Sequence, residues 1–306
     1  MSGVAAQPWR WTRRERRDFL RGLVFISPWL IGFAAFLAYP IGASLYYSFT
    51  DYDILGKAVN WVGFDNYRRL LYGDEYIGKV LFNTLYFVAY GVPSGLVTAF
   101  ALAVLLNSNL RFRSLFRTLF YVPAVVPAVA STMVWLWIYN VQYGVINAAL
   151  RALSLPAIPF LSSQQLVKPS LIVIHCWASG GSMVIFLAAL QDVPRSLYDA
   201  AIVDGAGWWK RFWHVTIPMI SPVILYNLLM GVIGSLQTFA RIYVLTGGGP
   251  NYASYFYNLF LYENAFSYFK LGLASAQAWI LFVVIMLLTL VMLRTSGRWV
   301  YYAGAA

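Results

Sequence analysis

The 306-residue sequence is 60% hydrophobic and only 11% charged, with a mean hydropathy of +0.65 and a formal net charge of +11. Soluble domains carry about 25% charged residues, so this composition excludes one and indicates an integral membrane protein. The basic residues lie between apolar stretches, which fits membrane orientation better than nucleic-acid binding, and the single cysteine, Cys176, excludes an intramolecular disulfide and a cysteine metal site.

The chain begins with a basic segment, residues 1–21, that contains RWTRRERRDFLRG. This segment resembles the charged start of a signal peptide, but the apolar stretch behind it is much longer than the ~7 to 15 residues of a signal core. We therefore expect residues 1–21 to remain as a tail before a first membrane anchor.

Six stretches contain the roughly 20 mainly apolar residues that a bilayer core of about 30 Å requires. They are 22–48, 81–106, 115–139, 171–190, 220–240 and 271–293. Their length and continuous apolar character favour helices, because barrel strands would alternate over about 10 residues. The sequence therefore predicts an all-α integral membrane protein with six transmembrane helices in a domain spanning 22–294. Five prolines should kink these helices: Pro28, Pro40, Pro93, Pro123 and Pro127.

Lysine and arginine positions predict the orientation of the six spans. Most of the 22 basic residues lie in the N-terminal tail, in 107–117, in the loop 192–218 and in the C-terminal tail 295–306. The positive-inside rule places these segments in the cytoplasm. The remaining basic residues, Arg241 among them, are expected in the outer segments.

The loop 192–218 interrupts two apolar runs with LYDAAIVDGAGWWKRFWHVTIP. Pro194 should end the fourth span, and Ser196 with Asp199 has the S-x-x-D spacing of a helix cap. Gly205 can adopt the left-handed conformation that ends a helix. A second short helix over 207–214 is expected before Pro218 opens the fifth span.

This loop has two interpretations. Its tryptophans and basic residues suit a helix lying in the lipid headgroup layer. Alternatively, the two short helices form a rigid knob that exposes small residues and a turn to a cytosolic partner. The residue pattern favours the knob.

The loop resembles the cytoplasmic EAA loop of bacterial ABC importer permeases, which reads E-A-A, three residues, G, nine residues, I-x-L-P. The matching residues are Asp199, Ala200, Ala201, Gly205, Val215, Ile217 and Pro218. Four further stretches resemble the carbohydrate-uptake branch of that family, in order along the chain. They are PWLIGFAAFLAYPIGASLYYSFTDYD, VGFDNYRRLL with Asn83-Thr84, RTLFYVPAVVPAVASTMVWLWIY and VLTGGGPNYAS. The chain is thus similar to the first membrane component of the maltose and glycerol-phosphate permeases.

The resemblance implies a type I ABC importer permease fold and a non-catalytic subunit of an ATP-driven sugar importer in the bacterial plasma (inner) membrane. The implied partners are a second homologous permease, an ABC ATPase dimer, an extracytoplasmic sugar-binding protein and a carbohydrate. ATP and Mg would belong to the ATPase, since no G-x-x-x-x-G-K-[ST] phosphate loop occurs in this chain. The residues expected to couple to the ATPase are Asp199, Ala200, Ala201, Asp204, Gly205, Ala206, Trp209, Phe212 and Pro218.

A neutral sugar requires amide or hydroxyl groups beside aromatic surfaces. By its distance from GGGP, the segment 234–239 aligns with the stretch that contacts sugar in the maltose permease. Polar residues of the fourth span should face the bundle interior. The expected substrate path is Gly234, Ser235, Gln237, Thr238, Phe239, His175, Trp177 and Gly181. The lack of a basic cluster within the spans disfavours a phosphorylated cargo.

Each of these residues also has a structural interpretation. Serine and threonine commonly bond their own helix or a neighbour, His175 suits an interhelical contact, and Trp177 suits packing. The sequence fits three other functions less well. An ion-driven secondary transporter would need acidic residues at midmembrane, and an intramembrane enzyme would need a cluster that His175 and His214 do not form. A receptor or scaffold would not need the specific loop.

Overall fold

The computed structural model describes residues 12–56, 59–108 and 111–302. Over these ranges the regular structure is helical, apart from an isolated bridge between Thr50 and Trp61. Within the described residues four helices are long and apolar enough to cross a membrane, and the number rises to six if each of two bent helix pairs counts as one span. The all-α prediction is therefore confirmed, and every predicted span corresponds to one long helix or one bent pair.

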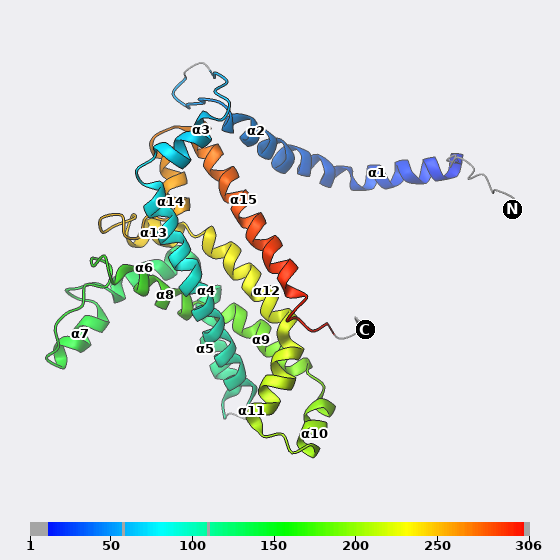
Figure 1. Cartoon of the computed structure of the whole chain (residues 1–306), viewed down its shortest axis with the longest axis vertical. Helices are drawn as coiled ribbons and strands as arrows, with labels where there is room; N and C mark the ends of the chain where they lie inside the picture. Colours follow the sequence, from blue (N-terminus) through cyan, green and yellow to red (C-terminus); the bar gives the residue numbers. More distant parts are fainter. Residues whose placement is uncertain (1–11, 57–58, 109–110, 303–306) are drawn as a thin grey trace.

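The elements follow one another along the chain as shown in Figure 1. The first half contains α1 (Arg13–Phe33), η1 (Ala34–Ala38), α2 (Tyr39–Ser48), α3 (Asp65–Arg68), η2 (Arg69–Gly73), α4 (Ile77–Asn107), α5 (Arg113–Val125), α6 (Ala128–Ile138) and α7 (Val145–Ala152). The second half contains α8 (Val167–Trp177), α9 (Gly180–Asp192), α10 (Arg195–Val203), α11 (Trp208–Arg211), η3 (Phe212–Thr216), α12 (Ile217–Leu236), α13 (Ala240–Leu245), α14 (Tyr257–Tyr262), η4 (Glu263–Ser267) and α15 (Leu271–Ser296). The η elements are π-helical turns.

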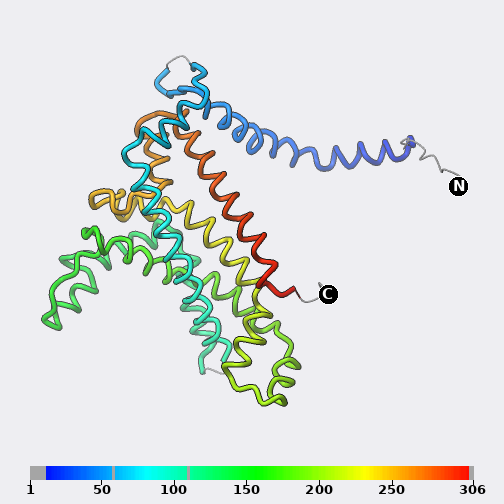
Figure 2. The backbone as a smooth tube through the Cα atoms, viewed as in Figure 1, coloured from blue at the N-terminus to red at the C-terminus, as the bar shows by residue number. Residues whose placement is uncertain are grey.

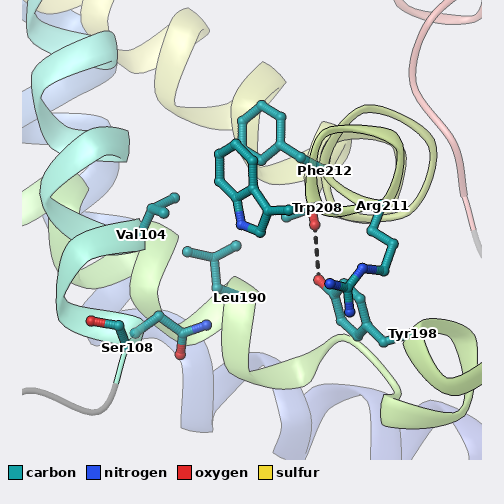
Figure 3. Close-up of a pocket in the computed structure, with 9 residues that line it drawn as sticks. Val104, Ser108, Leu190, Tyr198, Trp208, Arg211 and Phe212 are labelled. Atoms are coloured by element: carbon teal, nitrogen blue, oxygen red, sulfur yellow. Dashed lines mark hydrogen bonds between the residues drawn. The ribbon is translucent and has the colours of Figure 1, made fainter. Parts of the chain in front are cut away.

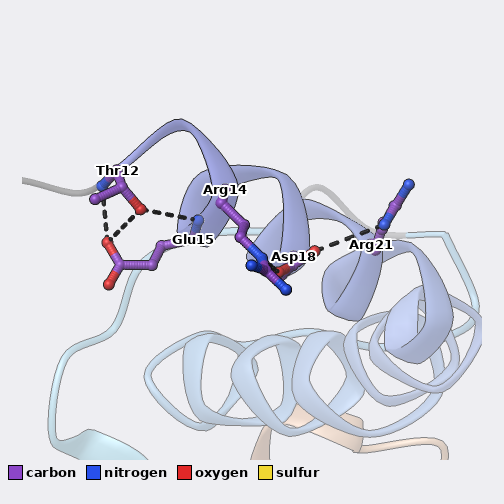
Figure 4. Close-up of polar contacts among 5 residues, drawn as sticks. All are labelled: Thr12, Arg14, Glu15, Asp18 and Arg21. Carbon is purple, nitrogen blue, oxygen red and sulfur yellow. Dashed lines mark hydrogen bonds and ion pairs between the residues drawn. The ribbon is translucent and has the colours of Figure 1, made fainter.

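Helix α1 extends away from the remaining helices (Figures 1 and 2), and none of its residues is buried. Its N-terminus carries a capping box that we did not predict. The Glu15 amide donates to the Thr12 hydroxyl at 3.3 Å, and the Thr12 amide donates to the Glu15 carboxylate at 2.7 Å (Figure 4). The helix begins at Arg13, so the boundary that we expected between residues 21 and 22 lies inside it.

Helix α4 is the central helix, because it packs against α8, α9 and α12. Four small residues, one every fourth position, form a buried stripe along it: Gly91, Gly95, Ala99 and Ala103. Residues that small let helix backbones approach closely in membranes. The stripe therefore allows a neighbouring helix to approach α4 closely, as His175 of α8 does at Gly95.

Two apolar cores lie at different heights along α4. Core 1 includes Phe87 of α4, Ile174 of α8 and Leu236 of α12, together with residues of α13 and α14. Core 2 includes Ala103 of α4 and Ile220 of α12, together with residues of α9. The middle of α4, the break between α8 and α9, and the middle of α12 thus lie between two packed regions.

The third and fourth predicted spans are broken helices. The pair α5 and α6 is bent by 102°, where Pro127 holds the preceding Val126 in an extended conformation. The pair α8 and α9 is bent by 46°. At that second break a Cβ on Gly180 would lie 2.1 Å from the Phe120 carbonyl oxygen, so α9 can approach α5 only through a glycine.

The other four prolines lie within continuous helical segments. Pro28, Pro93 and Pro123 lie within α1, α4 and α5, and Pro40 follows the π-helical turn η1 at the start of α2. The helical hydrogen bonding therefore continues past these four prolines.

Candidate functional site

The loop 192–218 forms one end of the molecule, at the bottom of Figure 1. Helix α10 begins at Arg195, and its N-cap is Pro194, with no side-chain hydrogen bond at the cap. The predicted capping box of Ser196 and Asp199 is therefore wrong. Because Ser196 is already the second residue of the helix, it does not occupy the position from which a serine caps.

Gly205 ends α10 as predicted, with φ +72°. The Ala206 amide donates to the Ala201 carbonyl at 2.9 Å, and the Gly205 amide donates to the Ile202 carbonyl at 3.0 Å. These two bonds form the Schellman motif, which closes a helix at a left-handed residue. A Cβ on Gly205 would meet no atom within 4 Å, so backbone strain alone opposes a side chain there.

The predicted second short helix is not a separate element. The chain is helical without a break from Trp208 to Leu236, through α11, η3 and α12. Pro218 therefore lies inside this helix and does not open a span. The wider π-helical turn η3 directly precedes the proline, which has no N–H to donate, and the helix continues past it.

Side-chain contacts hold the loop against the bundle. The Tyr198 and Thr216 hydroxyls are 2.9 Å apart, which joins α10 to η3. The Phe212 ring stacks on Trp208 with 5.4 Å between the ring centroids, and its centroid lies 5.9 Å from that of Phe100 of α4. The loop therefore has a fixed geometry relative to α4.

A cavity of about 310 Å³ lies between this loop and the ends of α4 and α9 (Figure 3). Its lining consists of Val104, Asn107, Ser108, Leu190, Tyr198, Trp208, Arg211, Phe212 and Thr216. The Arg211 Nε atom is buried and has no hydrogen-bond partner among the described residues. The cavity at this end of the molecule is therefore lined by apolar side chains and by the guanidinium of Arg211.

The apolar side chains of the loop are exposed. Val203 is 87% exposed, Trp209 65% and Ile202 53%. Of the residues that we predicted for coupling, Asp199, Ala200, Asp204, Gly205 and Trp209 are exposed, whereas Ala201, Ala206, Phe212 and Pro218 are partly buried. A cluster of exposed apolar residues on a rigid turn is typical of a protein interface.

The residues predicted for the substrate path do not gather in one cavity. Ser235 is buried, Trp177, Gly234 and Gln237 are exposed, and Gly181, Thr238 and Phe239 are partly buried. The Thr238 hydroxyl donates to the Gly234 carbonyl at 3.1 Å, which is the structural alternative for a membrane threonine. Among them, His175 lines a polar cavity.

That cavity, of about 270 Å³, lies between core 1 and core 2; we call it the midbundle cavity. Its lining consists of Val92, Gly95, Leu96, His175, Ala178, Ser179, Ser182, Asn227, Gly231 and Arg241. A Cβ on Gly95 would lie 2.8 Å from His175 Nε2, so the missing side chain leaves space for the imidazole. Asn227 is 4% exposed, and its amide donates to the Val223 carbonyl at 2.9 Å.

Arg241 is the residue that sequence reasoning misplaced. We expected it in an outer segment, but after Leu236 the chain forms α13, which packs against α6. This path brings Arg241 to the midbundle cavity beside His175. No periodic pattern in the sequence predicts that the chain changes direction after Leu236.

The GGGP segment serves as a structural turn. The Asn83 amide donates to the Tyr252 carbonyl at 2.8 Å and accepts from Lys168 Nζ at 3.0 Å. The Tyr257 amide donates to the Thr84 hydroxyl at 3.0 Å. Asn83 and Thr84 thus attach the segment that follows GGGP to the start of α4.

In the described ranges no group of three or more His, Cys, Asp and Glu residues could hold a metal ion.

Residues 91–301 match the family described as "Binding-protein-dependent transport system inner membrane component". The chain is 39% identical to the probable ABC transporter permease protein YesP of Bacillus subtilis, over 99% of this chain and 98% of that protein. It is 31% identical to the sulfoquinovosyl glycerol transport system permease protein SmoG of Agrobacterium fabrum, over 93% of each. Its fold is similar to that of a chain in the crystal structure of a bacterial alginate ABC transporter in complex with an alginate pentasaccharide-bound periplasmic protein. That match has a TM-score of 0.82 and 23% identity, and covers 94% of this chain and 96% of the other.

Proposed function

Because the chain belongs to the family of inner membrane components of binding-protein-dependent transport systems, we propose that it forms half of a carbohydrate import path and is driven through the loop 192–218. The chain is a non-catalytic, multi-pass permease subunit of an ABC transporter, with the type I importer permease fold. The carbohydrate cargo and the coupling role of the loop are the proposal.

The geometry of the loop is the observation that carries the coupling role. Helix α10 is closed by the Gly205 turn and joined to η3 by Tyr198 and Thr216, so its exposed apolar residues form a fixed surface. That surface suits a cleft on an ATPase. Shifting a conformational equilibrium from 1:99 to 99:1 takes about 5.5 kcal/mol of differential binding, which a rigid connection can transmit.

The proposed assembly has four further components. They are a second homologous permease, an ABC ATPase dimer that holds ATP and Mg, an extracytoplasmic sugar-binding protein and the carbohydrate. The exposed apolar surface of α1, which has no buried residue, supports a partner within the membrane. We propose that the chain lies in a bacterial inner membrane with both termini and the loop 192–218 in the cytoplasm, as the distribution of basic residues indicates.

The proposal is tested by Gly205→Pro in the complete transporter. Proline cannot adopt the φ of +72° found here and has no N–H to donate to Ile202, so α10 would lose its end. We expect the variant to insert into membranes but to lose co-purification of the ATPase and all uptake of carbohydrate. Gly207→Ala is the control, because Gly207 has φ −67° and a Cβ there meets no atom within 4 Å.

Normal uptake by Gly205→Pro would contradict the coupling role. Activity of the chain purified without an ATPase would instead favour an ion-driven transporter.

A further inference from the structure

The midbundle cavity lies beside the middle of α4 and α12 and at the break between α8 and α9. Its residues on α4 fall between Phe87 of core 1 and Ala99 of core 2, and its residues on α8 and α9 fall between Ile174 and Met183 of the same cores. Packed apolar side chains therefore flank the cavity on both sides along the bundle. A polar lining at this depth is costly in a membrane protein and marks a functional site.

The lining contains a cation without a counter-ion. Arg241 lines the cavity, and no acidic residue does. Within the described residues Arg241 has no ion pair or hydrogen bond, since the ion pairs there join Arg14 and Arg21 to Asp18 and Arg68 to Asp65. Arg241 is partly buried, and an unpaired guanidinium in such a position is unfavourable until an anion reaches it.

The other polar groups of the cavity supply further hydrogen-bond donors. The Ser179 Oγ atom is buried and has no partner among the described residues, so its hydroxyl is free to donate. His175 supplies one ring N–H when neutral, and Ser182 supplies a second hydroxyl. Asn227 has already used an amide hydrogen on Val223 and retains another. A cation surrounded by donors, with no carboxylate, is complementary to the oxygens of an anion.

Building on the proposed import function, we propose that the midbundle cavity binds the anionic group of an acidic saccharide through Arg241, Ser179 and His175. The cargo is then an acidic carbohydrate, bearing a carboxylate, sulfonate or phosphate, and not the neutral sugar expected from the sequence. The cavity of about 270 Å³ is smaller than the ~300–1,000 Å³ typical of sites that enclose a whole ligand. It therefore receives the charged unit of the cargo, and the remainder of a longer saccharide extends beyond it.

The test uses the complete transporter, with both permeases, the ATPase dimer and the binding protein, in proteoliposomes. Three matched pairs of compounds separate the three anionic groups from the sugar itself. They are digalacturonate against galactobiose, sulfoquinovosyl glycerol against glucosyl glycerol, and glycerol 3-phosphate against glycerol. ATP-driven uptake of each compound is measured for the unmodified chain and for Arg241→Gln.

We expect uptake of one acidic member to fall about tenfold or more in Arg241→Gln, the effect of losing hydrogen bonds to a charged group. Uptake of any transported neutral member should not fall. Arg294→Gln is the matched control, because it removes one positive charge from an exposed position in the last turn of α15. Arg241→Lys provides a second variant if Arg241→Gln fails to assemble. Lysine keeps the charge but loses the bidentate geometry of the guanidinium. The KM for the acidic cargo should therefore rise, while uptake of the neutral compound stays constant.

Two results would overturn the inference. One is transport of neutral carbohydrate only, with unchanged rates in the Arg241 variants, which would leave the proposed import function intact. The other is acidic-cargo uptake that is insensitive to both Arg241 variants, as expected if the second permease neutralises Arg241. Failure of the assembled transporter to carry any carbohydrate would instead contradict the proposed function.

Discussion

The loop 192–218 and the midbundle cavity contrast in how their groups fit their surroundings. The loop exposes apolar side chains such as Val203 and Trp209 at one end of the bundle, whereas the cavity places Arg241 and the buried Ser179 Oγ atom among apolar helices. Each region holds side chains that lack a suitable partner within this chain. Those of the loop are apolar, and those of the cavity are polar or charged. Contact with a protein surface would bury the exposed apolar turn, and a bound anion would compensate the unpaired cation of the cavity. The unmatched groups thus indicate the kind of partner that each region takes.

The largest expected effect comes from filling the cavity with Gly95→Leu. A Cβ at residue 95 already lies 2.8 Å from His175 Nε2, so the leucine would displace the imidazole and occupy the cavity. We expect uptake of every cargo to be abolished while the ATPase still co-purifies. Gly78→Leu is the control on the same helix, because a Cβ there meets no atom within 4 Å. Normal uptake by Gly95→Leu would show that cargo does not pass this cavity.

A second prediction reverses the character of the loop with Val203→Asp. Burying a valine at an interface contributes about 1.5–3 kcal/mol, so a charge there should weaken ATPase binding by about 10- to 100-fold. Co-purification at graded detergent and salt concentrations measures the loss. Tyr72→Asp changes an equally exposed residue, 88% accessible in η2, and should leave ATPase binding unchanged. Equal binding by Val203→Asp would mean that the apolar surface of α10 is not the docking surface.

A third prediction concerns the connection between α10 and η3. Tyr198→Phe and Thr216→Val each remove the hydroxyl contact of 2.9 Å, at a cost of about 1 kcal/mol. We expect each variant to transport less carbohydrate per ATP hydrolysed, and the double variant to be no worse than either single one. Additive losses in this double-mutant cycle would show that the two hydroxyls act independently.

The smallest expected effect is that of Ser179→Ala. Because the Ser179 hydroxyl has no partner within the described part of the chain, its removal should not lower the midpoint temperature of thermal unfolding. The KM for an acidic cargo should still rise several-fold, since one hydrogen bond to the anion is lost. A loss of thermal stability with an unchanged KM would assign Ser179 to packing.

The sequence predicted the loop better than the cavity, and the reason is physical. The turn at Gly205 depends on one residue and its close neighbours, so a local pattern was sufficient. The continuity of the helix through Pro218 was not predictable, because a proline at a helix start and a proline behind a π-helical turn have similar local sequences.

The cavity depends on contacts between distant elements. Its lining brings together α4, α8, α9, α12 and α13, and the position of Arg241 follows from the turn that the chain makes after Leu236. Residue type alone marked His175 as a polar residue within a span. It could not show that the glutamine and threonine of 234–239 would lie outside the cavity, since no sequence period describes the segment where α12 ends.

The uninterrupted helix from Trp208 to Leu236 has a mechanical consequence. Its 29 residues extend about 44 Å, with Trp209 at one end and Asn227 and Gly231 of the cavity further along. A tilt imposed at Trp209 therefore moves the cavity wall as part of the same lever, without an intervening hinge loop. ATP hydrolysis on one side of the membrane and release of cargo within it would then be linked by the same rotation of this helix.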